Sequence, residues 1–346
     1  MSAPLRIGIL RDHPTAGGDA FARIVRLACD DVRAERGIDA AFEVVEEQAD
    51  GLPRGTAAAV EAAFARLVDR GVVAVIGPAI SDNGLVVRDL ADAQRLACVN
   101  WTGGEQTRSE WMFHYQVGSL EEEPGFLALH LAAHDLRRVA LVDDRSLVGR
   151  RYVEFFHAAV ARFGIALSTH VQAPDEADAG GVVARLRETR ITTLVYLGLW
   201  DVARALALEM TRVGWQPRAF TNSALMYGHA NAQWRREWDG WTYVDAYSDD
   251  NPVLRAVTAR LGPEHGTAPV TVAAAYDMGR LVAEGIASAP ERTRAGVKDG
   301  LERVKLVPAA LGGAGTTMGF GRWERAALKG RFLVLRTWRD GASVEI

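Results

Sequence analysis

The 346-residue sequence contains only two cysteines, Cys29 and Cys98, which is too few for a disulfide framework. Cys29 falls in a helical pattern and Cys98 in an apolar run, so we expect two small buried side chains; a single bridge or a reactive thiol is the alternative. No apolar run approaches the roughly 20 residues of a membrane span. The 44 acidic and 40 basic residues nearly balance, so bulk charge does not predict nucleic-acid binding.

The sequence also lacks motifs that bind nucleotides, metals or a catalytic nucleophile. No G-x-G-x-x-G follows a predicted strand, and G-x-x-x-x-G-K-[ST], H-E-x-x-H and G-x-S-x-G do not occur. His130 and His134 are four residues apart, but no third ligand accompanies them, so we interpret the pair as solvated helix surface. We therefore expect no cofactor, no metal and no enzymatic activity.

The first residues contain no apolar segment typical of a signal peptide, and a strand is already predicted at Leu5–Leu10. Two expectations stay open at this point: a cytoplasmic chain, or the mature end of an exported one.

Strand and helix patterns alternate along most of the chain. The β-branched run Val72–Ile76 is typical of a strand buried on both faces. Such alternation predicts parallel sheets covered by helices. The series starts again near Ser119, where Glu121, Glu122 and Glu123 favour the first turn of a helix; we interpret these acids as helix capping in preference to a metal site.

The fold class predicted is α/β, with two doubly wound parallel-sheet lobes and a ligand cleft between them. We expect residues 1–118 and 250–325 in lobe 1, and residues 119–249 and 326–346 in lobe 2. Three crossovers would join them, near Val117–Ser119, Ala246–Asn251 and Glu324–Gly330. In the tail, Met318–Trp323 and Gly330–Trp338 look like late strands that flank a polar turn and are added to finished sheets.

Ligands of doubly wound sheets bind outside the carboxyl ends of the strands, so residues that directly follow predicted strands are candidates. Ser81 is expected at a helix N-cap, where its hydroxyl and free amides of Asn83 and Gly84 would bind an anionic or carbonyl oxygen; a plain cap is the alternative. The other candidates follow later strands and combine aromatic walls with small polar groups: Trp101, Thr102, Gly103, Gly104, Trp200, Ser223, Tyr227 and Tyr247. For Trp101 the alternative is a core tryptophan.

Three segments carry a family resemblance. Gly71–Ser81 reads GVVAVIGPAIS, Ala274–Asp277 reads AAYD, and Gly319–Trp323 is followed by Lys329 and Gly330. They resemble the type I periplasmic binding proteins of the leucine/isoleucine/valine-binding family, receptors of branched-chain amino-acid ABC importers. The resemblance implies a small-molecule ligand, a permease partner, a monomer or weak dimer, and a periplasmic location.

The resemblance also implies roles for single residues. Ser81, Thr102, Gly103 and Gly104 would hold a ligand carboxylate, and Trp200 would flank the ligand. The family binds the ligand's ammonium through an acid, but Asn222–Leu225 carries none here. The neighbouring loops offer other acids, Asp201, Asp245 and Asp249.

An uncompensated ammonium in a closed cleft is costly. We therefore expect a small carboxylate or amide with an apolar or aromatic body, in contact with Trp101, Trp200, Tyr227 and Tyr247; amino acids are the alternative. The predicted function is a non-catalytic solute receptor that closes on its ligand for an ABC importer. A cytoplasmic ligand sensor that controls a partner is the alternative, and an enzyme is a third hypothesis that no nucleophile–base set supports.

Overall fold

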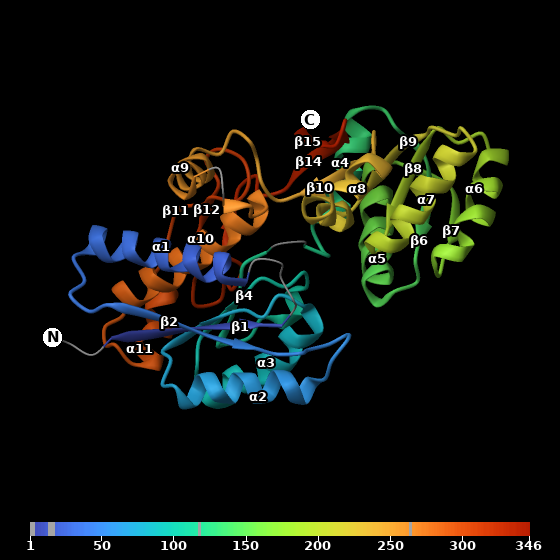
Figure 1. Ribbon diagram of the computed structural model, residues 1–346. Helices are drawn as coiled ribbons and strands as arrows, with labels where there is room; N and C mark the ends of the chain where they lie inside the picture. The colour runs from blue at the N-terminus through green and yellow to red at the C-terminus, as the bar shows by residue number, and fades with distance from the viewer. Residues whose placement is uncertain (1–3, 13–17, 117–118, 263–264) are drawn as a thin grey trace. The chain divides into compact units, whose positions relative to one another are not determined.

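The computed structural model describes residues 4–12, 18–116, 119–262 and 265–346. The chain divides into two compact units, Met1–Val117 with Tyr247–Phe332 and Gly118–Ala246 with Leu333–Ile346 (Figure 1). It therefore passes three times from one unit to the other, which agrees with the predicted fold class. The third passage comes later than expected, so residues 326–332 lie in the first unit and not in the second. Part of the first predicted crossover, residues 117–118, lies outside the described residues.

The first unit is built on a parallel sheet of five strands in the order β2-β1-β3-β4-β5. Its strands are β1 (Leu5–Arg11), β2 (Phe42–Gln48), β3 (Ala74–Ile76), β4 (Cys98–Asn100) and β5 (Met112–His114). The three residues of β3 are fully buried, as its β-branched run predicts.

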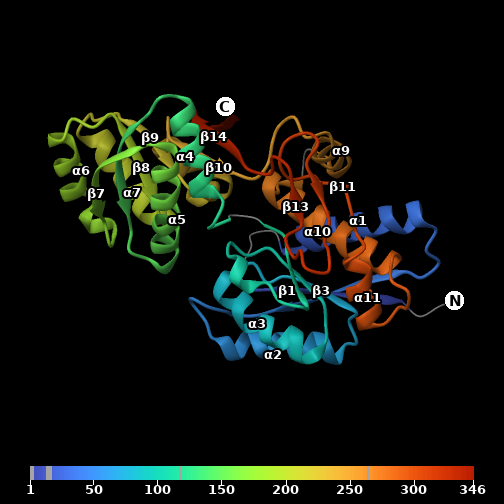
Figure 2. The ribbon, with the colours of Figure 1, turned by 180° about the vertical axis from the view of Figure 1, so that it is seen from behind.

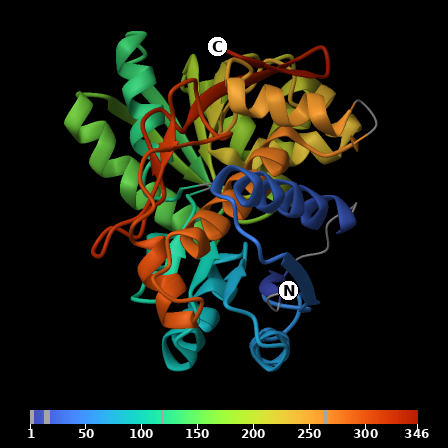
Figure 3. The ribbon, with the colours of Figure 1, turned by 90° about the vertical axis from the view of Figure 1, so that its left-hand side faces the viewer.

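Helices cover both faces of this sheet. They are α1 (Gly18–Arg36), α2 (Ala57–Asp69), α3 (Ser81–Gln94), α9 (Pro252–Leu261), α10 (Pro269–Ala287) and α11 (Arg294–Leu301), with a short 3-10 turn η1 (Glu105–Thr107). Helices α1 and α10 lie side by side over one face, and α2 and α3 cover the other (Figure 3). Thr56 caps α2 by accepting a hydrogen bond from the Ala59 amide at 3.1 Å.

A small antiparallel sheet also belongs to the first unit. It consists of β11 (Val307–Pro308), β12 (Thr317–Met318) and β13 (Leu328–Lys329). The prediction of a strand at Met318–Trp323 is wrong, because β12 ends at Met318 and Trp323 is 88% exposed. The predicted polar turn Glu324–Lys329 is also wrong, since its last two residues form β13.

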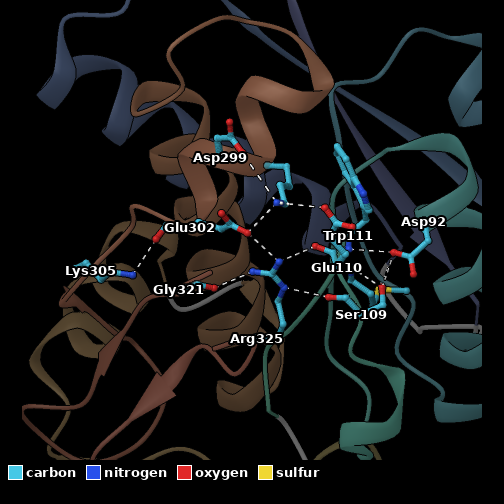
Figure 4. Close-up of polar contacts among 11 residues, drawn as sticks. Asp92, Ser109, Glu110, Trp111, Asp299, Glu302, Lys305, Gly321 and Arg325 are labelled. Carbon is cyan, nitrogen blue, oxygen red and sulfur yellow. Dashed lines mark hydrogen bonds and ion pairs between the residues drawn. The ribbon is translucent and has the colours of Figure 1, made fainter. Parts of the chain in front are cut away.

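The buried Arg325 guanidinium fixes the segment between β12 and β13 in place of a strand ladder (Figure 4). It donates hydrogen bonds to the carbonyls of Ser109, Glu110 and Gly321 at 2.8–3.0 Å. It also pairs with the Glu302 carboxylate at 2.8 Å. Local β-propensity in this segment is overridden by these long-range contacts.

The second unit contains a seven-stranded sheet in the order β15-β14-β10-β9-β8-β6-β7. The parallel strands are β6 (Arg138–Asp143), β7 (Ala166–Gln172), β8 (Thr193–Leu197), β9 (Arg218–Thr221) and β10 (Thr242–Asp245). The late strands β14 (Val334–Arg339) and β15 (Ala342–Glu345) add to it antiparallel, so the tail completes this sheet as predicted.

Its helices are α4 (Glu123–Ala133), α5 (Leu147–Phe163), α6 (Ala179–Glu188), α7 (Trp200–Arg212) and α8 (Ala232–Glu237), with 3-10 segments η2 (Glu176–Asp178) and η3 (Ser223–Ala230). Helices α4 and α5 pack together, as do α6 and α7, and the two pairs cover opposite faces (Figure 2). The carboxyl ends of β6, β8, β9 and β10 therefore share one edge of this sheet.

Both cysteines are buried free thiols in the first unit, which confirms their predicted packing role. Burial raises the pKa of Cys29 to about 12 and that of Cys98 still further. Among the described residues, no helix combines the length and apolar character needed to cross a membrane.

Candidate functional site

The carboxyl ends of β1 and β3 border a pocket in the first unit. It is partly open to solvent, and its lining combines apolar residues with the charged residues Arg11 and Asp12: Ile9, Leu10, Arg11, Asp12, Phe21, Ile76, Gly77 and Trp101. The rings of Phe21 and Trp101 lie 5.3 Å apart and form its aromatic wall. Trp101, a predicted site residue, thus lines a pocket at the expected edge of the sheet.

Asp12, which directly follows β1, organises the entrance to α3. Its carboxylate accepts the backbone amides of Ala79 and Ile80, each at 2.9 Å, and the side-chain amide of Asn83, also at 2.9 Å. Asn83 in turn exchanges two hydrogen bonds with the backbone of Leu52, at 2.9 and 3.1 Å. The two backbone amides that precede α3 therefore already donate their hydrogen bonds to the Asp12 carboxylate.

The helix start differs from the prediction made for Ser81. The N-cap residue is Ile80, and Ser81 is the first, half-buried residue of α3. The Gly84 amide closes the first turn on the Ile80 carbonyl at 2.8 Å. The predicted Ser81 cap and the free Gly84 amide are therefore wrong, while ligand contact by the Ser81 hydroxyl stays a prediction.

Thr102, Gly103 and Gly104 form a loop after β4 that is closed by its own hydrogen bonds. The fully buried Thr102 hydroxyl bonds to Asn100 Oδ1 at 2.8 Å and to the Thr107 hydroxyl at 2.9 Å. The Thr107 hydroxyl donates to the Gly104 carbonyl at 2.8 Å. These bonds give Thr102 a role in shaping the loop, and its predicted ligand contact remains untested.

Trp200 and Tyr227 lie close together in the second unit, which also contains Ser223. Trp200 begins α7 and stacks on Trp234 with 4.4 Å between ring centroids. Tyr227 is 56% exposed and lies 6.1 Å from Trp200. The remaining predicted aromatic, Tyr247, is only 4% exposed and pairs with Gly312 in the first unit, so it packs inside that unit.

Glu123 is the acid that the sequence analysis missed beside Ser223. Its Oε2 atom accepts the Ser223 backbone amide at 2.8 Å, although the two residues are 100 positions apart. The sequence analysis named Asp201, Asp245 and Asp249 as the acids near Asn222–Leu225 and did not include Glu123. The prediction that Ser119 caps the helix is wrong, because α4 begins at Glu123, its N-cap residue is Glu122, and no side chain caps it. The Ser119 hydroxyl accepts the Glu122 amide at 3.3 Å in the turn before the helix, and Glu123 is fully buried.

Burial raises the pKa of Glu123 to about 8; the Ser223 amide and the Tyr152 and Ser223 hydroxyls oppose this rise, and Asp245 adds to it. The Tyr152 and Ser223 hydroxyls lie 3.4 Å apart. Burial thus favours the protonated form of Glu123, which lies beside the Tyr152 and Ser223 hydroxyls.

The model of the periplasmic binding protein family matches residues 4–331, almost the whole chain. The chain belongs to the periplasmic binding protein family. Among curated protein sequences, no relative matches it.

Solved structures show that this binding protein has the type I fold. The leucine-binding protein LivK of Thermotoga maritima is 15% identical with a TM-score of 0.76, covering 99% of this chain and 97% of that one. LivJ of Streptococcus pneumoniae, in complex with isoleucine, is 16% identical with a TM-score of 0.78, covering 99% and 100%. A solute-binding protein of R. palustris, in complex with 4-hydroxybenzoate, is 15% identical with a TM-score of 0.76, covering 100% and 96%.

The AAYD segment of this binding protein, part of α10, holds the first unit together. The Asp277 carboxylate accepts the Ala310 and Leu311 amides at 2.7 and 3.0 Å and the Tyr115 hydroxyl at 2.7 Å. The Tyr276 hydroxyl donates to Asp31 of α1 at 2.8 Å. These residues therefore have a structural role in the segment that carries part of the family resemblance.

No metal centre accompanies the candidate site in the part of the chain that the structure describes, where no three His, Cys, Asp or Glu side chains gather. His130 and His134 lie at the end of α4, with their rings 4.1 Å apart.

Proposed function

We propose that this binding protein is a non-catalytic receptor that captures a small organic solute for an ABC importer. Closure of the two units on the ligand, in the periplasm, is part of the proposal. The observation that carries it is the pocket at the carboxyl ends of β1 and β3, in a chain of the periplasmic binding protein family. The Phe21–Trp101 wall suits an apolar ligand body, and Asp12 supplies a polar group at the same edge.

Relatives with the same fold support a small carboxylate or amino acid as the ligand class. One is described in complex with isoleucine and another in complex with 4-hydroxybenzoate. Both compounds join a carboxylate to an apolar body, and the Phe21–Trp101 wall suits the apolar body. We propose that Ser81 and the loop at Thr102–Gly104 contribute on the first unit, and Trp200, Ser223 and Tyr227 on the second.

The test begins with native mass spectrometry of the purified protein, followed by a thermal-shift screen of amino acids, amides and aromatic carboxylates. For any binder, Trp101→Ala should weaken the affinity by roughly 5–150-fold, because burying such a side chain contributes about 1–3 kcal/mol. Trp323→Ala is the matched control, since Trp323 is 88% exposed. A screen without any stabilising compound, or chemical conversion of the binder, would contradict the proposal.

Transport tests the importer assignment. Vesicles that contain the cognate permease should take up the identified ligand only when this protein is present. Uptake at the same rate without it would restrict the protein to ligand sensing.

A further inference from the structure

The two most exposed large apolar side chains of the described residues lie on neighbouring segments of the first unit. Trp323 is 88% exposed and Leu306 is 76% exposed. Trp323 lies between β12 and β13, and Leu306 directly precedes β11. The two segments run side by side, because the Phe320 amide donates a hydrogen bond to the Val304 carbonyl at 3.0 Å. Both apolar side chains therefore belong to one region of the surface, which we call the Trp323 patch.

The local backbone holds both side chains outside the core. Leu306 has a φ of +52°, in the left-handed region that a leucine rarely adopts. The loop that carries Trp323 is fixed by the buried Arg325, which donates to the Gly321 carbonyl at 2.8 Å (Figure 4). The Gly321 amide donates in turn to the Glu324 carbonyl at 2.9 Å. A strained leucine and an exposed tryptophan on a fixed loop are features of a binding surface, and a fixed loop loses little entropy when it binds.

The Trp323 patch also carries three exposed cations: Arg303, Lys305 and Arg322. None of the three forms an ion pair with a carboxylate among the described residues. The guanidinium of Arg322 lies 5.2 Å from the centre of the Trp323 ring. Glu324, the acid of the same loop, is already paired with Lys329 at 3.4 Å. The patch is therefore cationic, although the whole chain has a formal net charge of −4.

We propose that the Trp323 patch binds an anionic lipid surface, with Trp323 and Leu306 in the headgroup region and the three cations against lipid phosphates. Tryptophan rings favour the membrane–water interface, and neighbouring arginine and lysine side chains attract anionic lipids. This inference goes beyond the proposed function and does not rest on it.

The charge and size of the patch favour a lipid surface over a protein partner. A second copy of the chain, docked through the same patch around a two-fold axis, would bring the cations of both copies together, which is unfavourable. Two apolar side chains are also few for a stable protein interface, which buries about 800 Å² on each partner. Lipid headgroups supply negative charge without a matching shape.

The patch and the pocket of the first unit lie toward opposite ends of the parallel strands. Ala326 bridges in parallel to His114 at the end of β5, so residues 321–324 lie toward the amino end of that strand. The Arg325 side chain agrees, because it bonds to the Ser109 carbonyl, which precedes β5 (Figure 4). The pocket borders the carboxyl ends of β1 and β3. Lipid binding is therefore expected to leave the affinity for the solute unchanged.

The experiment measures co-sedimentation of the full chain with protein-free vesicles. One set contains phosphatidylcholine alone, and the other contains phosphatidylcholine with about 30% phosphatidylglycerol. We expect the protein to bind the anionic vesicles at low ionic strength. Binding should be about tenfold weaker or more with phosphatidylcholine alone, and equally weak in about 0.5 M salt, which screens the charges.

Two pairs of variants test the apolar and the cationic parts of the patch. Trp323→Ala should lower the partition coefficient about tenfold or more, whereas Leu147→Ala, at a 66% exposed position of the second unit, should leave it unchanged. Arg322→Gln combined with Lys305→Gln should lose about fivefold for each cation. Arg185→Gln combined with Arg187→Gln removes the same charge from exposed positions of α6 and should bind as the wild type does. Circular dichroism checks the folding of each variant.

Fluorescence shows whether the Trp323 ring itself enters the headgroup region. Of the nine tryptophans, all of which the structure describes, only Trp323 is exposed. Brominated lipids in the anionic vesicles should therefore quench part of the wild-type emission. Trp323→Phe should still bind these vesicles but lose that quenching.

The outcomes separate this inference from the receptor function. No binding to anionic vesicles, or equal binding by wild type and Trp323→Ala, would overturn it. Binding only to vesicles that contain a permease, or a dimer in sedimentation velocity that Trp323→Ala dissociates, would overturn it in favour of a protein partner. Solute affinity is measured separately in Trp323→Ala and should equal that of the wild type, so either proposal can fail without the other.

Discussion

A glycine in the middle of α10 sets how closely α1 approaches that helix. A Cβ atom at Gly279 would lie 2.9 Å from the Val25 carbonyl oxygen and 3.1 Å from the Ala28 Cβ. Both neighbours belong to α1, and Gly279 is buried. Real Cβ atoms do not approach a backbone oxygen at 2.9 Å without displacing it, so Gly279→Ala must move one helix relative to the other.

The sign of the effect follows from two opposing terms. Alanine is favoured over glycine by about 1 kcal/mol in a helix interior, which stabilises the variant. Overpacking a well-filled core costs about 1–3 kcal/mol. The nearest contact is a backbone atom and has no rotamer to escape to, so the cost lies toward the upper end. We expect a net loss of about 1–2 kcal/mol, or roughly 2–8 °C in the unfolding temperature of the first unit.

Gly181 of α6 provides the matched control. It is exposed, and a Cβ added there meets nothing within 4 Å. Gly181→Ala should therefore stabilise the second unit by about 0.5–1 kcal/mol through helix propensity alone. Differential scanning calorimetry and urea unfolding followed by circular dichroism measure both variants. Gly279→Ala with unchanged or increased stability, or two effects of the same sign, would refute the reasoning.

Three further predictions address buried polar groups. Burial raises the pKa of Asp277 to about 6 from an ordinary 3.8, so the folded state binds the proton more tightly than the unfolded state does. In urea unfolding, the free energy of unfolding of the wild type should therefore fall by about 3 kcal/mol relative to that of Asp277→Asn as pH rises from about 4 to 6.5. A difference that stays constant over this pH range would contradict the prediction. Arg325→Ala should lower stability by about 3–5 kcal/mol, because three carbonyls lose their donor and Glu302 keeps only Lys298 as a cationic partner. The exposed Arg322→Ala should change it by less than about 0.5 kcal/mol in the same assay. Cys29 and Cys98 should not react with a thiol reagent in the folded protein and should react stoichiometrically in denaturant; rapid labelling of the native state would show that the thiols are accessible.

The parallel sheets could be predicted because their signals are local. A buried strand needs a short β-branched run and an end signal, and Val72–Ile76 followed by Gly77 and Pro78 supplies both; the observed β3 covers Ala74–Ile76 of it. The sequence signals for helix ends are equally local, as the Thr56 cap of α2 illustrates. The restart of the series near Ser119 placed the first passage between the units for the same reason.

The tail could not be predicted, because its conformation depends on distant partners. Met318–Trp323 has strand-like residues, yet no neighbouring strand pairs with it beyond Met318 within the described structure. Arg325 instead bonds to carbonyls more than 200 positions earlier in the chain. Propensity describes what a segment prefers alone, and here tertiary hydrogen bonds decide.

The candidate site contains residues that a search limited to strand ends could not find. That search selected Trp101, which lines the pocket of the first unit. It considered only residues that follow strands in sequence, so Glu123 at a helix start was left out. The helix dipole favours acidic residues in the first turn of a helix whether or not they have another role. Because this explained the three acids at 121–123, the sequence analysis did not consider Glu123 as a site residue.

A signal for Glu123 was nevertheless present in the helical period. Residues four apart lie on one face of a helix, and Glu123 shares its face with Leu127 and Leu131, both fully buried. A carboxyl that continues an apolar stripe is predicted to be buried, whereas Glu121 and Glu122 fall outside this stripe. Periodicity thus separates one acid of the run from the other two.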